Sequence, residues 1–347
     1  MANVLDLRRR IRSVKNTRQI TKAMKMVSAA KLRRAQERAL AARPYARMIN
    51  SVLESLIRRI DVFGLENDSF CHPLFIARPE KRVLLIIVSG DKGFAGAFNA
   101  NILKTAAQFI AGNPDKEIDV EAVGRKGRDL MRRRYPSAVY NDGVRERKGA
   151  IEVTGDHVGM LEKLDAGRIE TLARSIIDRY GKGEIDAAYI VYNEFKSVIQ
   201  QRLVVERLMP LAKPGVQHLA GSIEPTTEER ERAAEAALSA GIDLEPADTA
   251  EADEEARKFG TADVDYIYEQ PAEELLAGLI PQYVSSMLFH AMSESVAAEH
   301  AARMTAMDSA TNNASDMIDA LTLHMNRVRQ AAITKEIIEI VSGAAAL

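Results

Sequence analysis

The residues best placed to do chemistry are the glycines of residues 89–96, which read SGDKGFAG. This stretch follows an apolar run and precedes a helix-forming segment that Asn99 could cap, which is the setting of a phosphate cradle. No Gly-Lys-Ser/Thr triplet ends it, and the spacing of Gly93 and Gly96 does not fit the dinucleotide fingerprint. We therefore favour a tight turn between strand and helix and keep a nucleotide site as a distant alternative.

Histidine and cysteine offer little else for catalysis. The single cysteine, Cys71, excludes an internal disulfide and a multi-cysteine metal site and is compatible with a reducing cytosol. No pair of the six histidines has metal-ligand spacing on one expected helix, and no Ser, His and Asp arrangement stands out. The sequence therefore predicts no catalytic residue, no metal and no cofactor.

Long helices at both ends of the chain are the strongest structural signal. Residues 282–342 contain neither Gly nor Pro, which allows about 90 Å of continuous helix at about 1.5 Å per residue. Residues 1–43 and 45–63 also lack both, and Pro44 between them could begin or kink a second helix. Two such rods can pair antiparallel and leave the middle of the chain as a separate globule.

A heptad-like spacing predicts where the two rods meet. In the C-terminal rod, apolar and small residues step alternately by three and four, which indicates a slender left-handed coiled coil. Its predicted seam is Met307, Ala310, Ala314, Met317, Leu321, His324, Val328, Ala331, Lys335 and Ile338. The N-terminal stripe is predicted as Val4, Leu7, Ile11, Val14, Thr21 or Ile20, Met24 and Val27.

The first rod is strongly basic, although the whole chain has a formal net charge of only −1. Within residues 1–43 only Asp6 and Glu37 oppose thirteen Lys and Arg side chains. Such a rod could be a nucleic-acid arm, a solvated helix face, or an axle threaded through the polar bore of a protein ring. The matching C-terminal heptads favour the axle, because a nucleic-acid arm needs no partner from the far end of the chain.

The middle of the chain alternates strands and helices, so the fold class is α/β: a Rossmann-like globule with a mostly parallel sheet and an antiparallel edge, joined to a long antiparallel coiled coil. Expected strands are residues 82–89, 118–123, 187–192 and 199–207. The expected divisions are an N-terminal helix at 1–62, the α/β domain at 63–208, a flexible acidic insertion at 209–262 with one short surface helix, a last strand at 263–271, and the C-terminal helix at 272–347.

Four stretches of the sequence resemble the gamma subunit of F-type ATP synthases. Residues 11–28 (IRSVKNTRQITKAMKMVS) resemble the N-terminal signature of that family, and residues 89–101 resemble its mid-chain loop. Residues 302–314 and 327–346 resemble its C-terminal helix. We expect the resemblance to cover everything except the insertion.

The resemblance implies a non-catalytic central rotor shaft. Its coiled coil would lie inside the ring of alpha and beta subunits, and its globular part would bind the epsilon subunit and the membrane c-ring. By motif alignment, contacts with the beta subunits are expected from the side chains of Met24, Lys25, Arg329, Gln330, Thr334 and Glu336. The implied location is peripheral, on the cytoplasmic face of a bacterial inner membrane. A basic coiled-coil protein that binds nucleic acid is the alternative.

Two departures from the family pattern are visible. Ala95 stands where many members carry Cys, which implies that a thiol is dispensable there. The insertion falls where plastid gamma subunits carry a regulatory dithiol, and here it holds no cysteine. We expect it instead to act as an acidic flap that docks on the basic rod or the beta subunits and tunes ATP hydrolysis.

Overall fold

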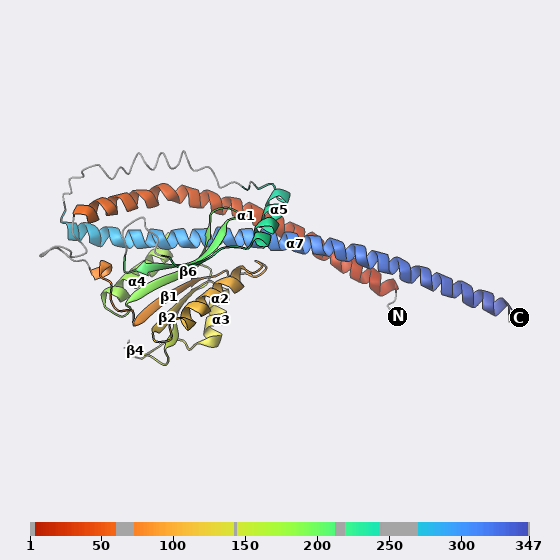
Figure 1. The fold of residues 1–347 in the computed structure, drawn as a ribbon, viewed down its shortest axis with the longest axis horizontal. Coiled ribbons are helices and arrows are strands. Elements are labelled where there is room, and N and C mark those ends of the chain that lie inside the picture. The colour runs from red at the N-terminus through yellow and green to blue at the C-terminus, as the bar shows by residue number, and fades with distance from the viewer. Residues whose placement is uncertain are drawn as a thin grey trace.

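A long two-helix shaft projects from one side of an α/β globule (Figure 1). The computed structural model describes residues 4–59, 73–141, 144–211, 219–242, 244 and 270–345. The shaft consists of α1 (Val4–Arg59) and α7 (Ala272–Ala345), which run antiparallel. Both ends of the chain therefore point away from the globule, and the C-terminus lies at the far tip.

Both helices are continuous for a reason visible in their composition. Helix α1 contains no Gly and α7 contains few helix-breaking residues, so the backbone hydrogen bonds of each helix continue without interruption. The expectation that a second helix could begin at Pro44 is wrong, because α1 continues through it. Likewise α7 begins upstream of Pro281 and includes it.

The globule is built on a six-stranded sheet with the order β5-β2-β1-β6-β7-β8. The central strand β1 (Arg82–Val88) pairs in parallel with β2 (Glu117–Val123) and with β6 (Ala187–Phe195). Residues 83–88 are all buried, as a strand covered on both faces requires. The predicted parallel sheet with an antiparallel edge is confirmed, since β7 (Gln201–Met209) runs antiparallel to β6.

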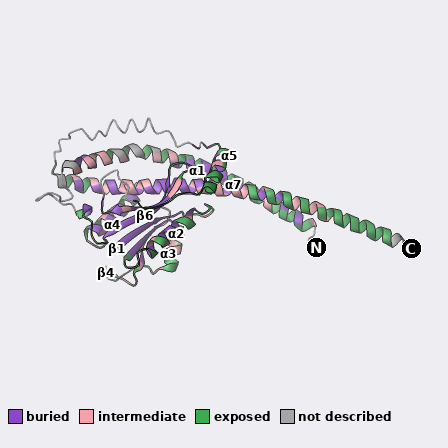
Figure 2. Ribbon diagram, in the orientation of Figure 1, coloured by how far each residue is buried: buried purple, intermediate pink, exposed green. Residues whose placement is uncertain are grey.

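Helices cover both faces of this sheet. One face carries α2 (Phe98–Ala111) and α3 (Arg125–Arg134), whereas α7 passes over the other beside α4 (Ala166–Gly181). The part of α7 that crosses the globule is buried over residues 291–299, and the distal part becomes exposed (Figure 2). The shaft and the globule therefore share one hydrophobic core at the root of the shaft.

Three further pieces were not expected from the sequence. One is β5 (Ile151–His157), which forms an edge of the sheet beside β2. A separate two-stranded hairpin joins β3 (Val139–Asn141) to β4 (Val144–Glu146). Within the predicted insertion, β8 (Leu219–Ile223) pairs with β7, whereas α5 (Thr227–Ser239), which follows it, is the short helix that we expected there. The expected strand at 263–271 falls mostly on residues 263–269, which lie outside the described residues.

An ion-pair network fastens the hairpin to the sheet. Arg145 in β4 donates to Asp119 at 2.6 Å and to Glu152 at 2.8 Å, and Arg179 in α4 also pairs with Asp119. Burial alone would raise the pKa of Asp119, but the hydrogen bond and positive charge of Arg145 lower it below its usual value. Each buried carboxylate is thus compensated, which is what keeps such a cluster tolerable inside a protein.

The composition of α7 also meets the length and hydropathy criteria for a membrane span, within residues 274–342. The structure gives another use for these apolar residues. Leu288, Met292 and Met304 are fully buried against the globule and the other helix of the shaft. Burial in a protein core therefore accounts for the apolar character of this helix at its root.

Candidate functional site

The shaft is the candidate functional site, and its two helices meet along a regular seam. On α1 the inward positions step strictly by four and three, and every one is buried or half-buried: Val4, Leu7, Ile11, Val14, Arg18, Thr21, Lys25, Ser28, Leu32 and Ala35. Of the two predicted alternatives, Thr21 lies in the seam, and Ile20 is 60% exposed. The predicted continuation through Val27 is wrong, because this side chain is 56% exposed.

The predicted seam of α7 is out of phase by one residue over part of its length. Met307 and Ala314 are buried as expected, but Met317 is 53% exposed and Ile318 is buried in its place. His324 is also exposed. Beyond Val328 every described side chain of α7 is exposed. The predicted seam positions Ala331, Lys335 and Ile338 are therefore wrong, because these side chains do not pack against α1.

Polar pairs connect the helices in the middle of the shaft. The hydroxyl of Thr311 donates to the hydroxyl of Thr21 at 2.8 Å. Nζ of Lys25 lies 2.7 Å from Oδ1 of Asp308, with both side chains largely buried. A hydrogen-bonded polar pair is satisfied in only one register. These contacts therefore fix the register in which α1 and α7 pack against each other.

A third element, α5, is fastened across this polar section. Lys25 also donates to Oγ of Ser239 at 2.9 Å, at the end of α5, and Arg33 donates to the carbonyl of Gly241 just beyond it. Ala236 and Ala237 of α5 are fully buried. A capping box formed by Thr226 and Glu229 begins the helix. Helix α5 of the predicted insertion thus docks on the basic rod, through a hydroxyl, a carbonyl and buried alanines.

The sequence-predicted contact residues fall into two groups. Arg329, Gln330, Thr334 and Glu336 all lie in the exposed distal part of α7, within about two turns of one another. The hydroxyl of Thr334 donates to the carbonyl of Gln330 at 3.0 Å. These four side chains together give the tip a polar collar, followed by the exposed apolar residues Ile337, Ile338, Ile340 and Val341.

The other group, Met24 and Lys25, lies elsewhere on the shaft. Lys25 is opposite Asp308, which is 21 residues before Arg329, so about 30 Å of helix separates the two groups. Met24 is half-buried, and Lys25 is only 8% exposed. The ammonium of Lys25 is therefore engaged inside this chain rather than displayed to a partner. No pattern of apolar residues could have revealed Asp308 and Ser239 as its partners.

The Gly-rich loop makes the tight turn that we favoured. We expected Asn99 to cap α2, and this prediction is wrong. Its Oδ1 accepts from the amide of Gly90 at 2.8 Å, and Ala97 occupies the N-cap position. Phe94 has a positive φ of 63° and is 72% exposed at the outside of the turn. Among the described residues there is no group of three or more His, Cys, Asp and Glu side chains that could hold a metal.

Taken together, the fold and the site define an elongated shaft protein: an antiparallel helical coil with a polar, register-setting seam, carried on a Rossmann-like domain (Figures 1 and 2). Comparison with known proteins gives the family. The model of the ATP synthase family (ATP-synt) matches residues 3–347. The chain belongs to the gamma chains of ATP synthase.

Relatives of full length support this assignment. The ATP synthase gamma chain of Solibacter usitatus is 44% identical over 100% of this chain and 99% of its own length. Those of Pelotomaculum thermopropionicum and Anaeromyxobacter sp. are 40% and 39% identical, each covering 100% of both chains. These alignments include the predicted insertion, so our expectation that it lies outside the family match is wrong.

A solved structure shows the same fold. A chain in the cryo-EM structure of the Tetrahymena thermophila mitochondrial ATP synthase central stalk and c-ring is 22% identical, with a TM-score of 0.52. The match covers 84% of this chain and 99% of the other. None of these comparisons supports the alternative of a nucleic-acid-binding protein.

Proposed function

We propose that this chain is a non-catalytic rotor shaft that couples ion-driven rotation of a membrane c-ring to conformational cycling of beta-subunit catalytic sites. The observation that carries the proposal is the polar seam. A shaft that transmits torque must resist sliding between its helices, and the Lys25–Asp308 and Thr21–Thr311 pairs oppose sliding at successive turns. The orientation of an asymmetric shaft can then favour one conformation of each surrounding site over another.

The partners follow from the same arrangement. The bare distal half of α7 would enter the ring of alpha and beta subunits, and the globule would bind the epsilon subunit and the c-ring. One copy per complex would lie on the cytoplasmic face of a bacterial inner membrane. Support comes from the family assignment and from the exposure of the tip, whose apolar residues gain a partner only inside another protein.

Within the shaft we propose the polar collar as the contact with the beta subunits. Arg329, Gln330, Thr334 and Glu336 display donors and acceptors that can make and break hydrogen bonds as the shaft turns. Met24 and Lys25 remain part of the proposal as a second contact, in which Met24 supplies the surface and Lys25 holds the helix beneath it.

Single alanine substitutions in the membrane-bound complex test the collar. Each lost hydrogen bond is worth about 0.5–1.5 kcal/mol, or up to 3 kcal/mol when a charge is involved. Arg329→Ala should therefore slow ATP synthesis about tenfold and Thr334→Ala less. The matched control is Lys335→Ala, because this exposed cationic residue lies at the same level of the helix but on the side opposite the four contact residues. Equal rates for Arg329→Ala and Lys335→Ala would overturn the assignment.

A further inference from the structure

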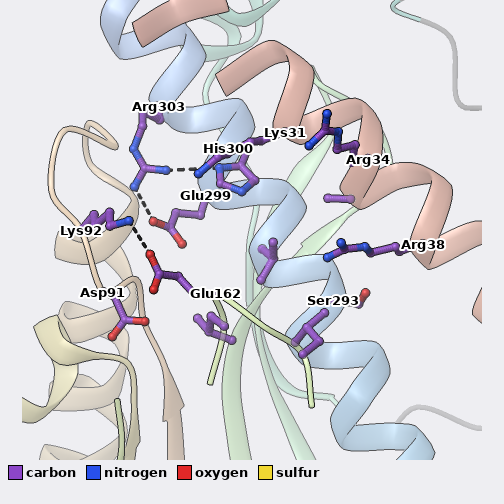
Figure 3. Close-up of a pocket in the computed structure, with 14 residues that line it drawn as sticks. Lys31, Arg34, Arg38, Asp91, Lys92, Glu162, Ser293, Glu299, His300 and Arg303 are labelled. Carbon is purple, nitrogen blue, oxygen red and sulfur yellow. Dashed lines mark hydrogen bonds and ion pairs between the residues drawn. The ribbon is translucent and has the colours of Figure 1, made fainter. Parts of the chain in front are cut away.

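A cavity of about 240 Å³ opens beside the root of the shaft, away from the distal tip. Four segments enclose it: α1, α7, the Gly-rich loop after β1 and the loop that precedes α4 (Figure 3). From α1 come Lys31, Arg34 and Arg38, which occupy one helix face at intervals of three and four residues. The shaft function assigned above uses none of these three side chains.

The charges of this cavity do not balance. Its far wall contains acids that are already engaged: Glu162 pairs with Lys92, and Glu299 pairs with Arg303 (Figure 3). Oδ1 of Asp91 accepts from the backbone amide of Arg125 at 2.9 Å. On the α1 side, by contrast, Lys31, Arg34 and Arg38 form no hydrogen bond or ion pair with any residue that the structure describes. The lining therefore carries five positive side chains, Lys31, Arg34, Arg38, Lys92 and Arg303, against three negative ones, Asp91, Glu162 and Glu299, and so has a net positive charge.

Uncharged donors line the α7 side of the same space. Ser293 is only 2% exposed and lines the cavity, and its hydroxyl has no hydrogen-bond partner among the described side chains and backbone groups. Nδ1 of His300 lies 3.2 Å from Nη1 of Arg303. Because a guanidinium has no acceptor, Nδ1 must accept, which leaves the ring proton on Nε2 as a donor. Burial and the nearby positive charges lower the pKa of His300 to about 4, so the ring is neutral at pH 7.

We propose that this cavity binds the diphosphate group of a small molecule. Lys31, Arg34 and Arg38 span about 10 Å along α1, which lets two or three of them reach a compact ligand with adjacent phosphates. A long acidic peptide fits less well, because it would have to pass Asp91 and Glu162 on the opposite wall. The buried hydroxyl of Ser293 completes a donor set for phosphate oxygens. This inference goes beyond the rotor function and does not depend on it.

Two sources share this chemistry, inorganic pyrophosphate and a nucleoside diphosphate. Calorimetric titration of the full-length chain at low salt with pyrophosphate, ADP and adenosine separates them. Pyrophosphate and ADP should bind and adenosine should not. Equal affinities would identify the diphosphate alone as the ligand, and tighter binding of ADP would show that the nucleoside also contributes.

Variants localise the binding. Arg34→Gln and Arg38→Gln should each weaken pyrophosphate binding about tenfold or more, since each removes a charged hydrogen bond. Ser293→Ala should weaken it less. Arg12→Gln is the matched control, because this exposed arginine lies on the same helix but far from the cavity. Far-ultraviolet circular dichroism must show each variant folded as the parent chain is.

Three results would overturn the proposal. The first is the absence of binding by the parent chain. The second is an equal loss in Arg12→Gln and Arg34→Gln, which would indicate diffuse attraction to a basic helix. The third is displacement of pyrophosphate by a short polyglutamate peptide at lower concentration than by unlabelled pyrophosphate, which would identify the cavity as a protein-docking site.

Discussion

Lys25 and Asp308, 283 positions apart in the chain, form a buried ion pair in the middle of the shaft. Their side chains are 10% and 13% exposed, and Nζ of Lys25 also donates to Ser239 of α5. One ammonium group thus connects three elements. A slip of one helical turn between α1 and α7 would leave both charges without a partner, so this pair specifies the register of the shaft.

Removing one member of this pair should destabilise the chain. We expect Lys25→Ala to lower the free energy of unfolding by about 3 kcal/mol, because it leaves Asp308 charged and unpaired in a nearly dry seam. The double variant Lys25→Met with Asp308→Leu should recover most of the loss. Urea unfolding followed by circular dichroism measures both.

The control for that experiment is Lys22→Ala, an exposed lysine on the same helix. If Lys25 acted only as a beta-subunit contact, Lys25→Ala would unfold at the same urea concentration as Lys22→Ala and would lose activity only in the assembled complex. That outcome would contradict the register role.

The docking of α5 can be released without touching the shaft. Ala237 of α5 is fully buried, whereas the adjacent Leu238 is 65% exposed. Ala237→Glu should therefore undock α5 and raise its hydrogen-exchange rate, because a carboxylate would be buried without a partner, whereas Leu238→Glu should not. We also expect Ala237→Glu to raise ATP hydrolysis by the assembled complex, since α5 covers a face of the turning shaft. Unchanged hydrolysis and synthesis would leave α5 as a structural strap without a regulatory role.

Much of the architecture could be predicted because it rests on strong local signals. The long stretches without glycine predicted both rods, and the apolar run at residues 82–89 predicted a strand covered on both faces, which is β1. Strands and helices that alternate along the chain predicted the parallel sheet. In each case the local preference and the final packing agree.

The seam could be predicted only in part, because its middle is polar. A search for apolar periodicity selected Met24 and Val27, whereas Lys25 and Ser28 are the buried residues. These polar positions are stable only through partners distant in sequence, such as Asp308, and no single segment carries that information. The same holds for Asn99, whose side chain is used by the Gly90 amide rather than by its own helix.

The stability of the chain should depend on the protonation of His300. Burial and the positive charges of Arg303, Lys31 and Lys92 lower the pKa of this imidazole to about 4, against 6.5 in the unfolded chain. Between these values the unfolded chain binds a proton that the folded chain does not, so stability falls as the pH falls from 6.5 towards 4. The effect is at most about 3 kcal/mol.

Comparison with His300→Gln isolates that effect. The nearby Glu299 has a raised pKa, also because of burial, but it is present in both proteins, so its contribution largely cancels in the difference. The parent chain should lose stability relative to His300→Gln between pH 7 and pH 5 in urea unfolding. His324→Gln, which alters an exposed imidazole, serves as the control. A pH-independent difference for His300→Gln would show that the ring titrates normally.

Two buried glutamates on neighbouring strands should respond oppositely to neutralisation. Glu194 on β6 accepts from Nη2 of Arg202 at 3.1 Å, so its charge is compensated. Glu206 on β7 accepts from the hydroxyl of Tyr192 at 2.8 Å, and burial together with the charge of Glu194 raises its pKa. When folding raises the pKa of a carboxyl group, the folded chain loses stability as the pH rises from about 4.5 through that raised pKa.

Glu206→Gln should therefore stabilise the chain at pH 8 and have little effect near pH 4.5, because glutamine still accepts from Tyr192 but carries no charge to desolvate. Glu194→Gln should destabilise it at pH 8, since Arg202 then loses its partner. Urea midpoints of both variants and the parent, measured from pH 4.5 to 8, test this contrast. A loss of stability in Glu206→Gln at pH 8 would mean that the ionised carboxylate is favoured in the folded state. In that case the hydrogen bond from Tyr192 to the carboxylate and the charge of Arg202 together would outweigh burial and the repulsion from Glu194.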